Sequence, residues 1–338
     1  MSSTEPVPET RDMSGDELSA DDAWLALRRY GRWPLVRDAF IRFRYGDGFS
    51  HARAFGFQLC LAAVPFMIAV VGLAADLGAE TPGQVVADTI ASITPGQSES
   101  IVRELLSDTE RSRDAGEVAL FLGLLTGLVA LTTAMAQIER GANRIYGVER
   151  DRPALAKYLR AAILALLAGL PALLGFVLLV AGRPFGESAE RHWGWGGHIR
   201  VAWDVVRWPV SLVLIVIAVG LLFRHAPRRH QPGLSWLLFG AVVSTVLWWV
   251  VSLLLAGYVR LSGGFGATYG PLTGVMALLL WANLTGIALF LGVAFAAQLE
   301  AQRVGVRRPA KQDSWKPGLT GEIPRARGRG SRAKNRSV

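Results

Sequence analysis

The residues of this chain that could do chemistry are few, and they stand apart from one another. The five histidines fall between or beside apolar runs, and His225 and His230 have no carboxylate at helical spacing. Cys60 is the single cysteine, which excludes an intramolecular disulfide and a multi-cysteine metal site. There is no glycine-rich phosphate loop ending in Lys-Ser or Lys-Thr, and no Gly-x-Ser-x-Gly elbow. We therefore predict no catalytic, cofactor-binding or metal-binding residue and no enzymatic activity. The histidines, for which solvation at the surface is the default interpretation, are His51, His192, His198, His225 and His230.

Ionisable side chains are also missing from the centres of the apolar runs. Asp76, Glu139, Arg140 and Glu300 stand only at the ends, and the adjacent pair Glu139 and Arg140 is interpreted as solvated. Charged groups inside a membrane usually mark function, so their absence argues against proton coupling through the core. The uncharged polar residues that remain more often serve helix packing than substrate binding. They are Gln58, Thr126, Thr132, Thr133, Gln137, Ser244, Thr245, Ser252, Thr273, Asn283 and Thr285.

These apolar runs predict the fold class: an all-α, polytopic membrane helix bundle with six transmembrane helices and amphipathic flanking helices. A helix of about 20 apolar residues crosses the hydrocarbon core of a bilayer. Pro65 and Pro171 lie inside the first and third runs and are expected to kink those helices. The fourth run is the shortest and could begin nearer Ile199. The six expected spans are residues 54–77, 118–137, 159–181, 208–223, 234–255 and 272–297.

Charge divides the remainder of the chain. Residues 1–22 hold seven acids against one base and are expected to be a disordered acidic N-terminal tail. Residues 23–53 mix aromatic and arginine side chains, which favours an interfacial amphipathic segment over a simple basic flank of the first span. Residues 54–302 form the expected six-helix transmembrane domain. Residues 303–338 hold eleven bases against two acids and are expected to be a disordered basic C-terminal tail.

The arginine distribution predicts orientation and partners. Segments on the side of both termini hold 27 basic residues against 8 on the other side, so both termini are expected in the cytoplasm. The basic tail is expected to lie on the anionic inner leaflet, which makes membrane lipids a partner. Nucleic acid is not expected, because the positive charge does not form a face of a folded unit. Homo-oligomerisation stays open.

Two segments on the outer side complete the pattern. Residues 78–117 carry apolar positions at helical spacing and predict two short amphipathic helices. Residues 183–207 carry three tryptophans suited to a membrane interface, and glycines that argue against a rigid domain.

A glycine-rich stretch leads into the sixth span. Its glycines permit positive φ and close approach, so it could form a re-entrant turn or a hinge that gates a cavity. A tight loop before a helix that begins at proline explains it equally well. The candidate hinge or substrate-path residues are Pro65, Pro171, Gly263, Gly264, Gly266, Tyr269, Gly270, Pro271 and Asn283.

Three segments together resemble the YihY/virulence factor BrkB family of bacterial inner-membrane proteins, once mislabelled as ribonuclease BN. They are residues 52–66 with Pro65, residues 142–148 reading Ala-Asn-Arg-Ile-Tyr-Gly-Val, and residues 269–300 from Tyr-Gly-Pro to Gln-Leu-Glu. The chain departs from the family at Ala294, where an acid is common, so no role of that acid transfers here. The resemblance implies a multi-pass protein of the plasma membrane, loosely linked to envelope lipid handling and transport.

Three functions remain open. The first is handling or transport of an envelope lipid or other amphipathic molecule, because a bundle without buried charge suits grooves better than ion relays. The second is a non-transporting membrane scaffold that recruits partners through its tails. The least favoured is a ribonuclease, which would need a cluster of metal-binding carboxylates or histidines that the sequence does not show.

Overall fold

The computed structural model describes residues 3–10, 18–76, 85, 89, 113–261, 272–306 and 308–311. The regular structure within these residues is helical, which confirms the predicted all-α membrane bundle. Of the two helices predicted in residues 78–117, nearly all lies outside this part of the chain. In chain order the elements are α1 (Ala20–Tyr30), α2 (Arg32–Tyr45), α3 (Gly48–Asp76), α6 (Arg113–Tyr146), α7 (Ala154–Leu164), η2 (Ala165–Gly169), α8 (Leu170–Val180), α9 (Gly182–Trp193), α10 (Gly197–His225), α11 (Leu234–Leu261) and α13 (Leu272–Arg303).

Six helical stretches are long and apolar enough to cross a membrane, as predicted. The first begins at Gly48, before the expected residue 54, because α3 continues unbroken into the basic flank. The fourth begins at Gly197, which agrees with the suggested start near Ile199. The stretches are Gly48–Ala69, Leu120–Tyr146, Ala154–Val180, Gly197–His225, Leu234–Val259 and Gly274–Arg303.

The third span contains a π-helical turn that the sequence did not predict. This turn, η2, ends at Gly169 and directly precedes α8, whose second residue is Pro171. Proline has no backbone N–H and cannot donate to the carbonyl four residues earlier, and wider π turns occur where the regular ladder is interrupted. By contrast, Pro65 lies within the continuous helix α3.

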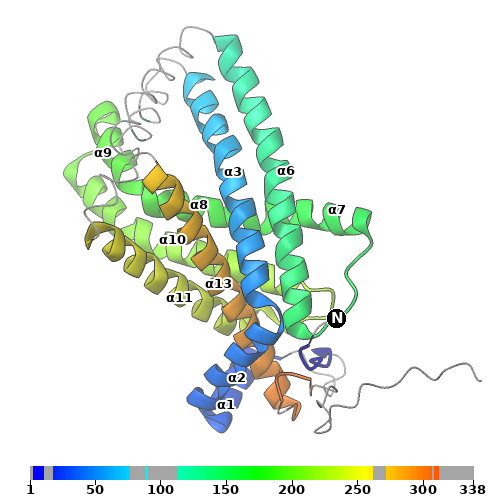
Figure 1. Cartoon of the computed structure of the whole chain (residues 1–338). Coiled ribbons are helices and arrows are strands. Elements are labelled where there is room, and N and C mark those ends of the chain that lie inside the picture. Colours follow the sequence, from blue (N-terminus) through cyan, green and yellow to red (C-terminus); the bar gives the residue numbers. More distant parts are fainter. Residues whose placement is uncertain are drawn as a thin grey trace, which may run out of the picture.

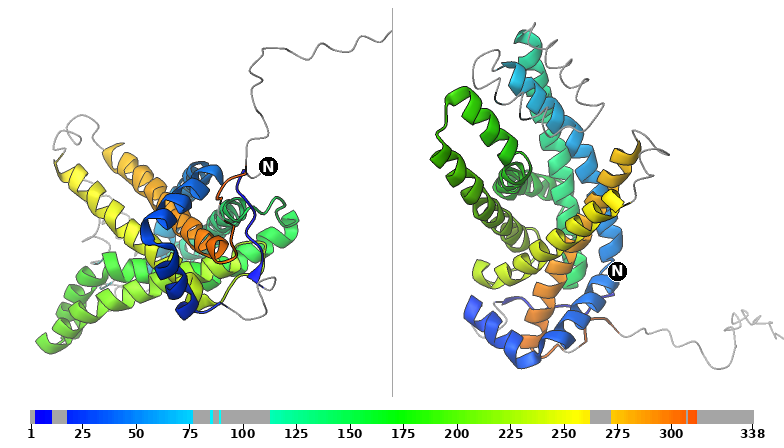
Figure 2. Two further views of the ribbon diagram at one scale, coloured as in Figure 1. Left: turned by 90° about the horizontal axis from the view of Figure 1, so that it is seen from below. Right: turned by 90° about the vertical axis from the view of Figure 1, so that its left-hand side faces the viewer.

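Helix α13 is the axis of the molecule. It packs against α3 and α11 along its length and against α2 near its end (Figures 1 and 2). Helices α3 and α6 run side by side on one flank, and α8 to α10 lie on the other. A Cβ on Gly286 would lie 2.7 Å from Ala52 O of α3, and one on Gly292 would lie 2.7 Å from Gly240 O of α11. Glycine is therefore needed where α13 crosses its two neighbours.

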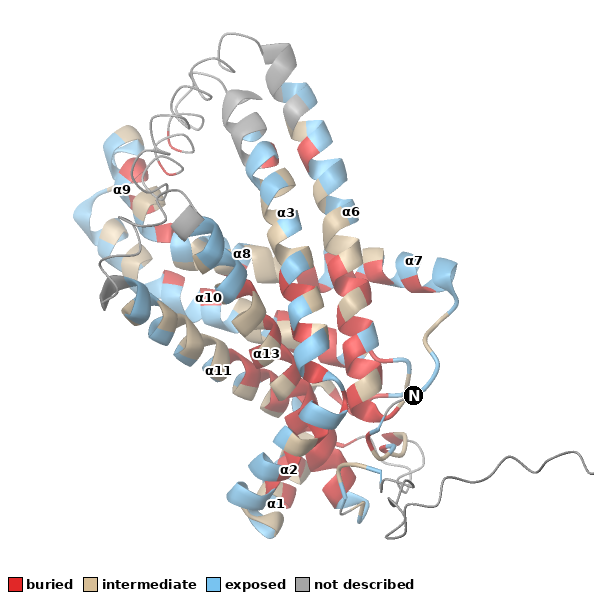
Figure 3. Cartoon of the chain, viewed as in Figure 1, coloured by how far each residue is buried: buried red, intermediate tan, exposed pale blue. Residues whose placement is uncertain are grey.

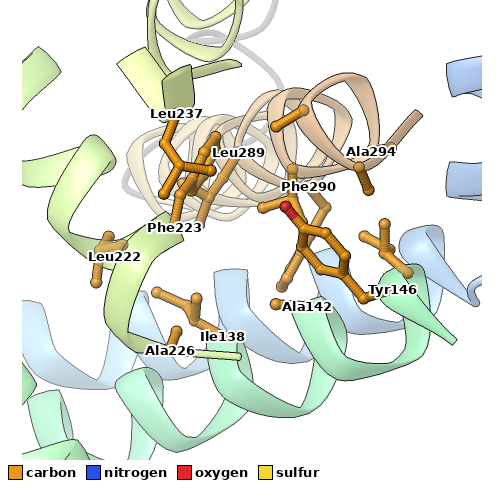
Figure 4. Packing of buried hydrophobic residues seen from close by; sticks show 14 of the residues in the cluster. Ile138, Ala142, Tyr146, Leu222, Phe223, Ala226, Leu237, Leu289, Phe290 and Ala294 are labelled. Carbon is orange, nitrogen blue, oxygen red and sulfur yellow. The ribbon is translucent and has the colours of Figure 1, made fainter. Parts of the chain in front are cut away.

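Burial is concentrated at one end, which we call the base. The base comprises α1, α2, the C-terminal ends of α6 and α13, and the loop between α10 and α11; Figure 3 shows most buried residues there. Half of the apolar stretch of α13 is buried, against 28% for each of the other five spans. Figure 4 shows the apolar contacts that close this end. They join Ile138 and Ala142 of α6, Phe223 of α10, Leu237 of α11, and Leu289 and Phe290 of α13.

Residues 3–10 cross the base as an extended segment, which we call the strap. Its Glu5 N–H donates to Pro309 O at 3.1 Å, and Lys311 N–H donates to Ser3 O at 2.8 Å. Between these bonds Thr4 and Ala310 form an isolated antiparallel bridge. For residues 3–10 and 308–311 this ordered contact differs from the disorder that the sequence predicts for the two tails. Backbone bonds pair the two segments, and Thr4, Val7 and Thr10 are buried against the base.

The tryptophan-rich loop also differs from its prediction. Residues 182–193 form helix α9, which ends at Gly194 with φ +64°. Phe185 contacts the rings of Trp193, Trp195 and Trp203, and Trp203 Nε1 donates to Gly182 O at 2.6 Å. The aromatic side chains thus order the segment despite its glycines.

Candidate functional site

An apolar groove runs between α8, α11 and α13, away from the base. It consists of two adjoining clefts of about 470 and 350 Å³ that share Ser252, Leu278 and Trp281. Both clefts are wide open along the helices and are not enclosed cavities, unlike the concave sites that surround most of a small ligand. All lining residues belong to the membrane-spanning stretches. From α8 they are Phe176, Leu179 and Val180; from α11, Trp248, Ser252, Leu255, Ala256 and Val259; and from α13, Ala277, Leu278 and Trp281.

Trp281 organises the groove. Its ring centroid lies 5.6 Å from that of Phe176 and 6.4 Å from that of Trp248, so one indole joins all three helices. Its Nε1 donates to Ser252 Oγ at 3.1 Å. The single hydroxyl of the lining is therefore already paired, and no lining residue is ionisable. Chemically, the groove can bind hydrocarbon by contact and offers neither an acid nor a base.

The predicted hinge and substrate-path residues do not gather at this groove. Gly263, Gly264, Gly266, Tyr269, Gly270 and Pro271 lie outside the described residues. Pro65 and Pro171 are not among the lining residues. Asn283 lies two positions after Trp281, and its backbone meets α3 at Gly56, on another side of α13. Its buried Oδ1 has no hydrogen-bond partner in the described structure.

Sequence reasoning missed the groove because its aromatic residues come from separate spans. Phe176, Trp248 and Trp281 share no local spacing that could reveal a site. An available signal was the placement of large aromatic rings in three different apolar runs, where aliphatic residues would suffice for contact with lipid.

The interpretation of the acids at the inner ends of the spans also needs correction. Glu139 is not solvated: it is 2% exposed, and its carboxylate lies 3.0 Å from Arg152 Nη1. Burial lowers the pKa of Arg152, against the attraction of Glu139. Glu300 is fully buried and paired with Arg229 at 2.7 Å. These acids are structural partners at the base because the loops after α6 and α10 fold back over them.

The histidines offer no metal centre in the described part of the chain, where no group of three or more His, Cys, Asp or Glu residues could hold an ion. His51 is half-buried, and its Nδ1 lies 2.8 Å from the Nε2 atom of Gln137. It is therefore not a solvated surface residue. His192 and His225 contact backbone carbonyls of their own helices.

Six spans, a packed base and an apolar groove define a helical multi-pass membrane protein. The sequence profile of the family described as Virulence factor BrkB matches residues 39–317, and the chain belongs to this family. The resemblance stated above is thereby confirmed.

The chain is similar to YfkH of Bacillus subtilis, which is named as a ribonuclease-like protein, with 28% identity over 80% of this chain and 96% of that protein. It is also similar to UPF0761 membrane proteins of Xanthomonas campestris pv. campestris and Xanthomonas axonopodis pv. citri, each 26% identical over 75% of this chain. The match covers 58% of the length of each of those Xanthomonas relatives. No solved structure matches the chain.

Proposed function

We propose that this membrane protein binds an envelope lipid or another amphipathic molecule in the groove between α8, α11 and α13 and moves it through the membrane. The observation that carries this proposal is a groove within the spans whose one hydroxyl is already paired. A groove at membrane depth meets hydrocarbon and not water, so apolar walls select acyl chains over polar solutes.

The position of the groove supports movement as well as binding. It ends on α11 at Val259 and on α13 at Ala277, close in sequence to the glycine-rich segment 262–271 that connects those helices. In this proposal the acyl chains lie along the apolar walls of the groove, which offers no ionisable group to a headgroup. Each methylene kept in contact with apolar surface is worth about 0.8 kcal/mol, which opposes escape of the chains into water.

The test is lipid transfer between leaflets in proteoliposomes. A fluorescent phospholipid is placed in both leaflets, and the fraction bleached by dithionite reports movement. The wild-type chain is expected to raise this fraction, and Ala256→Trp, which fills the first cleft, is expected to lower the transfer rate several-fold. Val246→Trp serves as the matched control, because Val246 is exposed on the same helix but does not line the groove. Liposomes that show no protein-dependent transfer would refute the proposal.

We propose further that the base faces the cytoplasm in a bacterial plasma membrane. The 27 basic residues on that side of the chain support this orientation. Binding of the basic tail to anionic lipid and homo-oligomerisation stay predictions.

The scaffold and ribonuclease alternatives remain distinguishable. A scaffold should lose its phenotype when residues 1–22 and 303–338 are deleted and keep it when the groove is filled. The strap gives that alternative no support, since residues 3–10 bind the chain itself. The name of YfkH suggests the ribonuclease alternative for this chain. An assay for RNA cleavage by the purified protein would test it. The absence of enzymatic activity stays a prediction.

A further inference from the structure

Arg42 of α2 is a fully buried cation that contacts no carboxylate in the described structure. Its Nε donates to Gln298 Oε1 at 2.8 Å, and its Nη1 donates to Glu5 O at 2.8 Å and Ile145 O at 3.2 Å. Its Nη2 is buried and has no partner among the described residues. Burial lowers the pKa of Arg42 to about 10, so the side chain is still charged at neutral pH. A buried guanidinium normally has an anion beside it, and here three neutral oxygens take that place.

Arg229, in the loop between α10 and α11, forms the other half of the cluster. Its two terminal nitrogens donate to the two carboxylate oxygens of Glu300, at 2.9 and 2.7 Å, and Nη2 also donates to Pro8 O at 2.6 Å. Its guanidinium lies over the Tyr146 ring at 4.5 Å. Burial lowers the pKa of Arg229, but the Glu300 carboxylate outweighs it and holds the pKa above its ordinary value. Arg229 therefore has its counter-ion, and Arg42 does not.

The strap lies on both arginines. Carbonyls of Glu5 and Pro8 each accept a bond from one guanidinium, and the Glu5 and Glu9 carboxylates add negative charge nearby. Without the strap, two guanidiniums would face the single carboxylate of Glu300. The strap thus supplies the negative field and acceptor oxygens that an anion would supply.

The strap is held mostly by polar contacts. It is extended, and of its three buried side chains, Thr4, Val7 and Thr10, only Val7 is apolar. Apart from its two bonds to the arginines, the contacts that hold it are mainly backbone and hydroxyl hydrogen bonds, among them Val7 N–H to Tyr146 O at 3.1 Å and Thr10 Oγ1 to Glu300 Oε1 at 3.3 Å. Segments with few apolar contacts open locally at low cost. Gly147, at φ +79°, leaves space for it, since a Cβ there would lie 2.7 Å from Pro6 Cα.

Unused donors remain around the arginines. Besides Arg42 Nη2, the Arg229 Nε and the Gln298 Nε2 atoms are buried without partners in the described structure. A phosphate group has several strong acceptor oxygens and pairs with arginine in a fork geometry. We propose that Arg42 and Arg229, with Gln298, form a phosphate-binding site that the strap occupies as an internal substitute and uncovers when it leaves. This proposal does not depend on lipid movement through the groove.

A reversible disulfide that fixes the strap to residue 310 tests the proposal on the full chain. Thr4 and Ala310 oppose each other between the two strap bonds, as a non-hydrogen-bonded antiparallel pair. Such pairs have Cα atoms about 4.5 Å apart, which lies within disulfide range. The chain would carry Cys60→Ser, Thr4→Cys and Ala310→Cys, purified in detergent. Calorimetric titration would then measure the affinity of the oxidised and the reduced protein for two probes. The probes are inorganic phosphate and a soluble short-chain phosphatidylglycerol.

We expect the reduced protein to bind at least one probe, and oxidation to weaken that binding at least ten-fold. Binding of both probes identifies free phosphate as sufficient, whereas binding of the lipid alone identifies a headgroup. Equal affinity in the two redox states, or no binding of either probe in the reduced state, would overturn the proposal.

Substitutions provide the second measurement. In the reduced protein Arg42→Gln should abolish binding, while Arg37→Gln on the same helix should leave it unchanged, since Arg37 is 69% exposed. Retained affinity in Arg42→Gln would also refute the site. If Arg42→Gln does not elute as a folded, monodisperse protein, the redox comparison decides alone.

Discussion

The base and the groove bury opposite kinds of chemistry. At the base, Arg42, Arg229 and Glu300 are enclosed by α2, α6 and α13 and bound in hydrogen-bonded pairs. In the groove, the lining residues are apolar except for Ser252. The difference teaches that this protein encloses charge at the base, where the ends of the spans pack against α2 and the loops, and keeps the groove within the spans free for hydrocarbon.

The largest effect should come from breaking the buried pair at the base. Glu300→Ala leaves Arg229 buried without its counter-ion, which should cost about 3–5 kcal/mol of the free energy of unfolding. Titration with sodium dodecyl sulfate in mixed micelles measures this. The control Glu187→Ala removes a half-exposed carboxylate that pairs with Arg183 and Arg200, and it should cost about 1 kcal/mol or less. Equal losses in the two variants would contradict the contrast between base and surface.

Two glycines of α13 compare the regions within one helix. At Gly292 a Cβ would lie 2.5 Å from Ser244 Cβ and 2.7 Å from Gly240 O, whereas at Gly274 it would meet nothing within 4 Å. Gly292→Ala should lose about 1–3 kcal/mol through overpacking. Gly274→Ala should be neutral or gain up to about 1 kcal/mol from helix propensity. The same unfolding titration measures both, and a loss in Gly274→Ala as large as in Gly292→Ala would show that α13 is packed evenly.

The polar contact in the groove should contribute less. A double-mutant cycle of Trp281→Phe and Ser252→Ala isolates the 3.1 Å hydrogen bond between them. Its coupling energy should be about 0.6 kcal/mol, the average for such bonds between membrane helices. A coupling above 2 kcal/mol, on the order of a buried charged pair, would remove the distinction from the base.

The smallest effect concerns the stability of the protein at acidic pH. Burial raises the pKa of Asp151, but the hydrogen bond from Asn143 and the charge of Lys157 outweigh it and hold the pKa below its ordinary value. The stabilisation is therefore complete above the unfolded pKa of about 3.9 and is lost as pH falls through the lower folded pKa. Asp151→Asn should flatten the fall in melting temperature below about pH 4. Asp21→Asn, at an exposed position, is the control; an unchanged acid profile in Asp151→Asn would contradict the prediction.

Much of the fold could be predicted from local pattern. Apolar length alone identifies six spans, and the mixture of aromatic and arginine residues in residues 23–53 predicts one or two helices where the structure has α1, α2 and the start of α3. Prediction failed where contacts are long-range. The strap, for example, looks like a polar tail, and its order comes from Tyr146 and Pro309, more than 130 residues away in sequence.

The candidate site was predicted less well than the fold. Of the hinge and path residues, only Pro65, Pro171 and Asn283 lie in the described structure, and none lines the groove. Glycine and proline signal local backbone behaviour, whereas the groove depends on how far apart three helices stand. That spacing is set by crossings such as the one at Gly292, which no local pattern reveals.

The sequence by itself determined that this chain is a six-span helical membrane protein and which family it resembles, because apolar length and residue order are properties of the chain alone. The tertiary structure decided which residues act together. It enclosed Arg42, Arg229 and Glu300 at the base, laid residues 3–10 over them, and gathered Phe176, Trp248 and Trp281 into one groove. The physical reason is that pairing of buried charges and contact between aromatic rings depend on distances in space, and helices far apart in sequence meet only after packing.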